Sequence, residues 1–194
     1  IKHIYIMFIM PALKTPICDF GTNAKNFQLN STINNLISLN DIKGKAGTLI
    51  MFICNHCPYV KAVIKDVVED CKNLEKFGIK AVAISSNDAV NYPEDSFENM
   101  IKFSKKHNFT FPYLFDKNQN VAKSYNAVCT PDFFGFNDNL ELQYRGRIRE
   151  LKDLKPVRVG QSDLFKAMKQ ISETNKGPKD QIPSLGCSIK WLDN

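Results

Sequence analysis

The chain has 194 residues and a formal net charge of +6, with 43% hydrophobic and 24% charged residues. This length favours one compact domain, and the apolar content excludes a chain that is mainly disordered. The 9 Gly and 9 Pro residues exclude a collagen-like chain. No apolar run reaches the ~18 residues that a membrane-spanning helix needs, so stable membrane insertion is not expected.

The first 15 residues are predicted to form an N-terminal extension, followed by a single domain over residues 16–194. The extension contains Lys2 and a short apolar run that ends before Pro11. Three interpretations fit this run: a start displaced upstream of the natural first residue, a remnant of a signal peptide, or an ordered strand. The first predicts a cytoplasmic protein, and the second a periplasmic or membrane-anchored one.

Strands and helices are predicted to alternate through the first half of the domain. The predicted elements are short strands near 27–29 and 36–39, a strand at 48–53, a helix that follows Cys57 and Pro58 with an apolar stripe from Val60 to Leu74, and a strand at 79–85. The strand at 48–53 is a continuous apolar run, which is typical of burial on both faces. The helix is amphipathic, and its apolar stripe places Asp66, Glu69 and Asp70 on the opposite face. Gly78 is expected to end this helix.

The second half continues the alternation. The predicted elements are a helix over 97–104, a strand at 113–115, a short helix near 121–125, strands at 132–136 and 140–144, and a helix at 164–171. Asp95 with Glu98 resembles a capping pair for the first of these helices, and Asp116 with Gln119 resembles one for the second. The alternation predicts an α/β fold with a largely parallel centre.

Residues 145–158 are strongly basic. The basic residues of this segment are Arg145, Arg147, Arg149, Lys152, Lys155 and Arg158. The segment fits either a solvated face or a docking patch for an acidic partner. Nucleic acid is not an expected partner, because few aromatic residues are interleaved with the charges.

Cys54 and Cys57 form a Cys-x-x-Cys motif between the buried strand and the amphipathic helix. Two intervening residues, wrapped into the first turn of a helix, bring the two sulfurs within disulfide reach. The Cys54 sulfur would then lie over the free N–H groups of that turn, which stabilise a thiolate. Pro58 suits the first helical position. A Cys-x-x-Cys motif at such a junction predicts a thiol–disulfide exchange pair.

His56 lies between the two cysteines. A protonated imidazole there would lower the pKa of Cys54 and make the pair more oxidising; the alternative is a surface histidine without a role.

Metal binding is a competing function for the motif, since Cys54, His56 and Cys57 could supply three ligands. The sequence contains no second Cys-x-x-Cys and no His-x-x-x-His, so neither a metal nor another cofactor is predicted.

The motifs together resemble the thioredoxin superfamily, and within it the redoxin branch of TlpA-like and AhpC/TSA peroxiredoxin-like proteins. The segments that carry the resemblance are residues 16–20, 39–45, 52–60, 129–133, 144–147 and 183–191. The resemblance implies a thioredoxin-like α/β fold, with a central mixed β-sheet flanked by helices on both faces.

The resemblance also implies roles for individual residues. Cys54 would be the attacking thiol and Cys57 the resolving one. Thr130 and Pro131 would form a substrate-binding loop with a cis proline facing the pair, and Cys129 beside it is a possible third redox thiol. The implied partners are protein thiols and disulfides, or a thioredoxin- or glutathione-type reductant. The resemblance leaves the oligomeric state open.

Two other activities compete with thiol–disulfide exchange. A peroxiredoxin-like thiol peroxidase is the main alternative, but its Pro-x-x-x-Thr/Ser-x-x-Cys motif is absent, since Ile50 and Cys54 stand at the Pro and Thr positions when Cys57 is aligned with the reactive cysteine. A metal-binding or chaperone-like module is the third. Of the remaining cysteines, Cys71 and Cys18 are expected to be structural, and no local pattern gives Cys187 a role.

Overall fold

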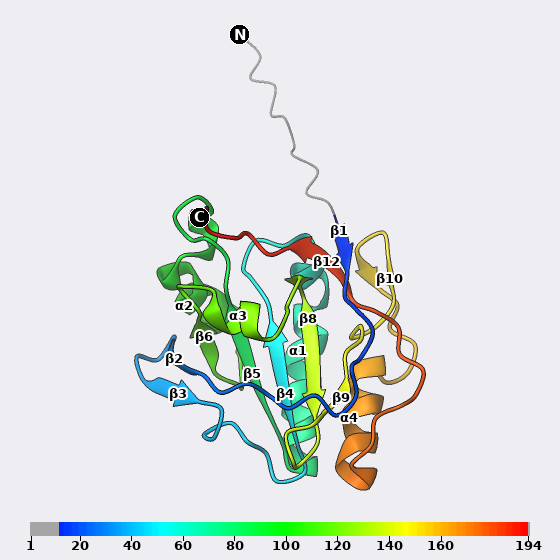
Figure 1. Ribbon diagram of the computed structural model, residues 1–194. Helices are drawn as coiled ribbons and strands as arrows, with labels where there is room; N and C mark the ends of the chain where they lie inside the picture. Colours follow the sequence, from blue (N-terminus) through cyan, green and yellow to red (C-terminus); the bar gives the residue numbers. More distant parts are fainter. Residues whose placement is uncertain (1–11, 194) are drawn as a thin grey trace.

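The computed structural model describes residues 12–193 (Figure 1). The central strands are β2 (Gln28–Ser31), β3 (Leu36–Ser38), β4 (Gly47–Phe52), β5 (Ile79–Ser85), β6 (Tyr113–Phe115), β8 (Asp132–Phe136) and β9 (Leu142–Tyr144). They form one seven-stranded sheet in the order β3-β2-β6-β5-β4-β8-β9. The β4–β5 and β5–β6 pairs are parallel and the other pairs are antiparallel, so the sheet is mixed with a parallel centre.

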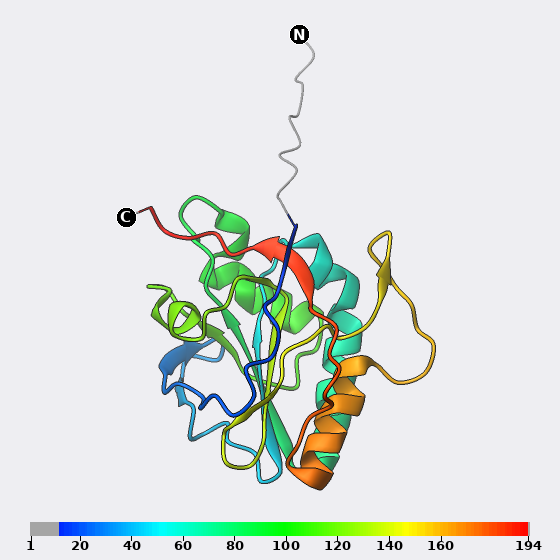
Figure 2. The ribbon, with the colours of Figure 1, turned by 45° about the vertical axis from the view of Figure 1, so that its right-hand side comes forward.

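Helices cover both faces of this sheet. They are α1 (Pro58–Leu74), α2 (Phe97–Lys106), α3 (Asn120–Ser124) and α4 (Asp163–Thr174), with 3-10 turns at Glu75–Phe77 and Pro93–Asp95. The apolar faces of α1, α2 and α4 share one buried cluster, and α3 packs into a second cluster on the other face. Figure 2 shows α1 and α4 side by side on the same side of the sheet.

Strand β4 separates the two clusters. Leu49 and Met51 point into the cluster beneath α1, and Ile50 and Phe52 into the cluster beneath α3. These side chains are 0–1% exposed. Complete burial of such a side chain contributes roughly 1.5–3 kcal/mol, which explains why the strand has no polar alternation.

The polar face predicted for α1 is wrong in part, because Asp66 and Asp70 are buried. The chain after β9 returns across α1, where Arg149 and Arg158 pair with Asp66 and the Ser162 hydroxyl donates to Asp70. These contacts bridge about ninety residues of sequence, so no local pattern could reveal them.

Most basic residues of the segment 145–158 form ion pairs within the domain. Its ion pairs are Arg145 with Asp132, Arg147 with Asp163, and both Arg149 and Arg158 with Asp66. The remaining two basic residues lie on a small hairpin made of β10 (Leu151–Lys152) and β11 (Lys155–Pro156). The structure therefore favours neither a wholly solvated face nor a dedicated docking patch.

A second, three-stranded sheet joins the two ends of the described chain. It contains β1 (Ala12–Lys14), β12 (Leu185–Ser188) and β7 (Cys129–Thr130), in the order β1-β12-β7 (Figure 1). The sequence predicted none of these strands, and it assigned residues 12–14 to the extension.

Residues 1–11 lie outside the described residues, so the interpretations of the N-terminal run stay predictions. Within the described chain, the helices lack the combined length and apolar character required to cross a bilayer.

Candidate active site

The two cysteines of the motif lie where the sheet meets α1. Cys54 follows the end of β4 by two residues, and Cys57 is the N-cap of α1 with Pro58 as the first helical residue. Both side chains are buried, with exposed fractions of 1% and 0%. The backbone N–H of Val60 in the first helical turn is one of the groups that lower the pKa of Cys57. The sequence predicted stabilisation of a Cys54 thiolate by this helix terminus, and that stays a prediction.

The pKa values of the pair follow from these contacts. The pKa of Cys57 is lowered, first by its hydrogen bond with Cys187, then by that with Cys54 and by the Val60 amide. The Thr130 carbonyl, 3.1 Å from the Cys57 sulfur, opposes this shift by accepting from the thiol. Burial is the main cause that raises the pKa of Cys54 well above its ordinary value. These contacts thus shift the pKa values of the two thiols in opposite directions.

The Thr130–Pro131 peptide bond is cis, as the family resemblance implied. Thr130 touches both cysteines: its hydroxyl oxygen lies 3.3 Å from the Cys54 sulfur, and its carbonyl oxygen accepts from Cys57. The structure therefore brings together four of the predicted site residues, namely Cys54, Cys57, Thr130 and Pro131.

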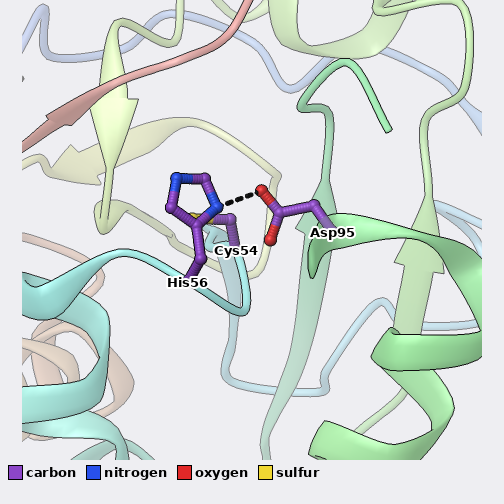
Figure 3. Close-up of side chains that lie close together, drawn as sticks. All are labelled: Cys54, His56 and Asp95. Atoms are coloured by element: carbon purple, nitrogen blue, oxygen red, sulfur yellow. Dashed lines mark hydrogen bonds and ion pairs between the residues drawn. The ribbon is translucent and has the colours of Figure 1, made fainter. Parts of the chain in front are cut away.

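His56 is paired with a carboxylate that the sequence did not identify. Its Nδ1 lies 2.6 Å from an Asp95 carboxylate oxygen (Figure 3). Asp95 is fully buried and also accepts from the Asn55 backbone N–H and from the Asn87 side-chain amide, at 2.7 Å each. The hydrogen bond with Asp95 is the main cause that raises the pKa of His56, against the opposing effect of burial. The positive charge predicted beside Cys54 is therefore stabilised by Asp95.

The predicted capping role of Asp95 is wrong. Ser96 is the N-cap of α2, and its hydroxyl accepts from the Asn99 backbone N–H. A carboxylate next to a serine before a helix offers two capping candidates in sequence. If Ser96 alone caps the helix, the Asp95 carboxylate is available for another contact. This was the only indication in the sequence that Asp95 could have a different partner.

Cys187 is the second functional candidate that the sequence missed. Antiparallel pairing of β12 with β7 places it opposite Thr130, and its sulfur lies 2.9 Å from the Cys57 sulfur. Cys129, the predicted third redox thiol, is buried, and its sulfur has a 3.8 Å contact with the Pro131 carbonyl oxygen. Burial raises the pKa of Cys129, and the hydrogen bond with Cys57 is the main cause that raises the pKa of Cys187.

A buried ion pair braces the loop that carries Thr130 and Pro131. The Arg145 guanidinium donates to both oxygens of Asp132, at 3.3 and 2.8 Å, and to the Asn126 carbonyl oxygen. The Ser184 hydroxyl donates to the Pro131 carbonyl oxygen at 2.8 Å. The proline loop is thus fixed from both ends.

The described residues contain one cluster of three metal-ligating side chains, made of Cys54, His56 and Asp95. Their ligand atoms lie within 4.8 Å of one another (Figure 3). Cys57, which the sequence grouped with Cys54 and His56, is not part of this cluster. His56 and Asp95 already bond to each other, and three ligands fall short of the four of a structural zinc site.

The groove next to the proline loop has a volume of about 140 Å³. Its lining includes Pro131, Val63 and Leu185 as apolar residues, and Arg147 and Arg149 as basic ones. Larger hollows lie elsewhere, among them one lined by residues of the 41–45 and 110–112 segments, away from the cysteines.

A thioredoxin-like fold with a Cys-x-x-Cys pair opposite a cis proline defines the class of protein. A model of the AhpC/TSA family matches residues 20–150, which is more than half of the chain. The chain belongs to this family, in the redoxin branch of the thioredoxin superfamily.

Comparison with individual proteins agrees. The crystal structure of an uncharacterized conserved protein from Geobacillus kaustophilus is 42% identical with a TM-score of 0.90, over 95% of this chain and 98% of that one. The thioredoxin domain of a thiol-disulfide oxidoreductase from Bacteroides vulgatus is 18% identical with a TM-score of 0.56, over 65% of this chain and 86% of that one. This likeness confirms the thioredoxin-like fold.

A curated relative carries a functional name. Thiol-disulfide oxidoreductase ResA from Bacillus subtilis (strain 168) is 27% identical over 117 residues, or 60% of this chain. The chain spans 61% of the length of that relative.

Proposed function

We propose that this chain is a thiol–disulfide oxidoreductase whose reacting pair is Cys54 and Cys57. The observation that carries the proposal is the contact of both sulfurs with Thr130, the residue before the cis proline. The similarity to a protein named as a thiol-disulfide oxidoreductase supports the same class of reaction. Protein disulfides or dithiols, and a thioredoxin- or glutathione-type reductant, are the proposed partners.

The reaction begins at Cys54. Its thiol, which lies 3.3 Å from the Thr130 hydroxyl oxygen, loses its proton to water and becomes a thiolate, while Cys57 stays a thiol that donates to the Thr130 carbonyl oxygen. This thiolate attacks one sulfur of a substrate disulfide R–S–S–R′. The bond between the substrate sulfurs breaks, a Cys54–S–S–R mixed disulfide forms, and R′S⁻ leaves.

Cys57 then resolves the mixed disulfide. The leaving R′S⁻ takes the proton from Cys57, and the Cys57 thiolate attacks the Cys54 sulfur. The products are a Cys54–Cys57 disulfide, R′SH, and RS⁻, which takes a proton from water. The substrate gains two electrons and the protein dithiol loses two, and the reverse sequence oxidises a dithiol.

The neighbouring residues are proposed to position the substrate and to adjust charge. The groove beside Pro131 would seat the chain of a protein substrate next to the pair. Protonated His56 offsets the negative charge of Asp95, which otherwise raises the pKa of Cys54.

Reduction of insulin disulfides by the protein tests the proposal. We expect Cys54→Ser to abolish turnover, and Cys57→Ser to accumulate the mixed disulfide, which mass spectrometry detects. Cys71→Ser is the matched control, because Cys71 is a buried cysteine of α1 that packs in the apolar cluster. Full activity of folded Cys54→Ser would rule out the proposal.

Thiol peroxidase activity is a second candidate, favoured by membership of the AhpC/TSA family. Ile50 and Cys54 in place of the proline and threonine of the peroxidase motif count against it. Fast formation of a sulfenic acid with equimolar hydrogen peroxide would favour the peroxidase, whereas fast reaction with disulfides alone would exclude it.

A further inference from the structure

We propose that Cys187 is a third redox thiol, which exchanges with Cys54 as the disulfide partner of Cys57. The oxidised protein then distributes one disulfide between two positions, Cys54–Cys57 and Cys57–Cys187. This inference rests on the proposed function for the origin of the first disulfide. The second disulfide has its own geometric basis.

The contact between the two sulfurs carries the proposal. The Cys57 and Cys187 sulfurs are 2.9 Å apart, at hydrogen-bond distance, and both side chains are at least 97% buried. A disulfide bond is about 2.05 Å long, so an approach of less than about 1 Å would form one.

The fold holds Cys187 in this position. Its strand β12 pairs with β7 so that Cys187 lies opposite Thr130, which itself contacts Cys57. The preceding residue, Gly186, lies so close to this loop that an added Cβ would come within 2.1 Å of the Thr130 carbonyl oxygen. The pairing and the close packing of Gly186 thus fix the strand that carries Cys187 against the proline loop.

The exchange step balances without another reactant. The Cys187 thiol loses its proton as its sulfur attacks the Cys57 sulfur of the Cys54–Cys57 disulfide. The Cys54–Cys57 bond breaks, the Cys57–Cys187 bond forms, and Cys54 leaves as a thiolate that takes up a proton. No electrons are gained or lost overall. The result is an oxidised protein in which Cys54, the proposed attacking residue, is a free thiol.

Disulfide mapping tests the proposal without reference to turnover. Trypsin leaves Cys54 and Cys57 in peptide 46–61, Cys187 in peptide 180–190 and Cys129 in peptide 124–145. Folded Cys54→Ser is incubated with oxidised glutathione, quenched with acid, alkylated and digested. We expect it to lose two of its five remaining thiols and to yield peptide 46–61 linked to peptide 180–190.

Matched variants identify the partner. Cys54→Ser/Cys129→Ser should form the same link, and Cys54→Ser/Cys187→Ser should form no internal link at all. Five free thiols in oxidised, folded Cys54→Ser, or a link to peptide 124–145, would overturn the proposal.

The wild-type protein provides a test that needs no stable variant. After oxidation it should contain both the disulfide inside peptide 46–61 and the link to peptide 180–190, and absence of the link would refute the exchange. The outcome is separable from the proposed function. A linked peptide in a protein without insulin-reducing activity would support the Cys57–Cys187 pair and refute the oxidoreductase. Insulin-reducing activity without the linked peptide would support the oxidoreductase and refute the Cys57–Cys187 pair.

Discussion

Removal of the Arg145 side chain should be far more damaging than removal of its neighbour Arg147. Arg145 pairs with Asp132 where the side chains are only 7% and 0% exposed, at 2.8 Å. Arg145→Met would leave the Asp132 carboxylate buried without its cation, at the point where the chain leaves the proline loop.

The expected cost follows from this burial. Breaking a buried ion pair by removing one partner costs about 3–5 kcal/mol, because the remaining charge is uncompensated. At about 2–4 °C per kcal/mol for a chain of this size, the melting temperature should fall by roughly 6–20 °C. The free energy of unfolding is measured by urea denaturation followed by circular dichroism at pH 7.

The pH dependence of this cost has a definite sign. Burial raises the pKa of Asp132, and Arg145 opposes that effect. Without Arg145 the folded-state pKa rises further above the unfolded value, so the folded protein binds the proton more tightly. The penalty is therefore full above the folded-state pKa and diminishes as the pH falls through it.

Arg147→Met is the matched control. Its pair with Asp163 has side chains that are 25% and 39% exposed, and such pairs contribute about 0–1 kcal/mol. Asp132→Asn combined with Arg145→Met should recover part of the loss, since no buried charge remains. Equal destabilisation by the two arginine variants, or a loss below about 1 kcal/mol for Arg145→Met, would refute the reasoning.

Three further predictions concern single positions. Gly186→Ala should lower the melting temperature, because the new Cβ would meet the Thr130 carbonyl oxygen at 2.1 Å; an unchanged value would contradict the close packing of β12. Asp95→Asn should lower the pKa of His56, measured by NMR titration, because the stabilising carboxylate is lost, and an unchanged titration would refute that cause. Burial raises the pKa of Asp70 to about 6, so the folded state holds this proton more tightly than the unfolded one. The stability of the wild type relative to Asp70→Asn should therefore fall as the pH rises from about 4 to 6, and a flat difference between them would contradict the burial.

The sequence predicted those parts of the fold that local patterns determine. The apolar run of β4 and the stripe of α1 reflect burial on two faces and on one face. Strand β4 lies within a residue of its predicted bounds, whereas α1 ends at Leu74 and a 3-10 turn at Glu75–Phe77 separates it from Gly78, the predicted end. The junction between them fixed the place of Cys54 and Cys57. The cis bond before Pro131 came from family resemblance, because spacing alone does not distinguish it from a trans proline.

The parts that the sequence missed depend on contacts between distant segments. Asp95 reads as a helix cap until the turn that carries His56 is folded against it, 39 residues away. Cys187 acquires its neighbour only when β12 pairs with β7, and it contacts a cysteine 130 residues away. Asp66 is a surface carboxylate by helical periodicity and a buried one because of Arg149.

The contacts among the cysteines converge on Thr130. Its hydroxyl meets the Cys54 sulfur, its carbonyl oxygen meets the Cys57 sulfur, and its backbone pairs with the strand of Cys187. Since each hydrogen bond depends on whether the sulfur is a thiol, a thiolate or part of a disulfide, each redox state presents a different set of partners to the same residue. The loop that is proposed to hold the substrate therefore contacts Cys54 and Cys57 through Thr130 and pairs with the strand that carries Cys187.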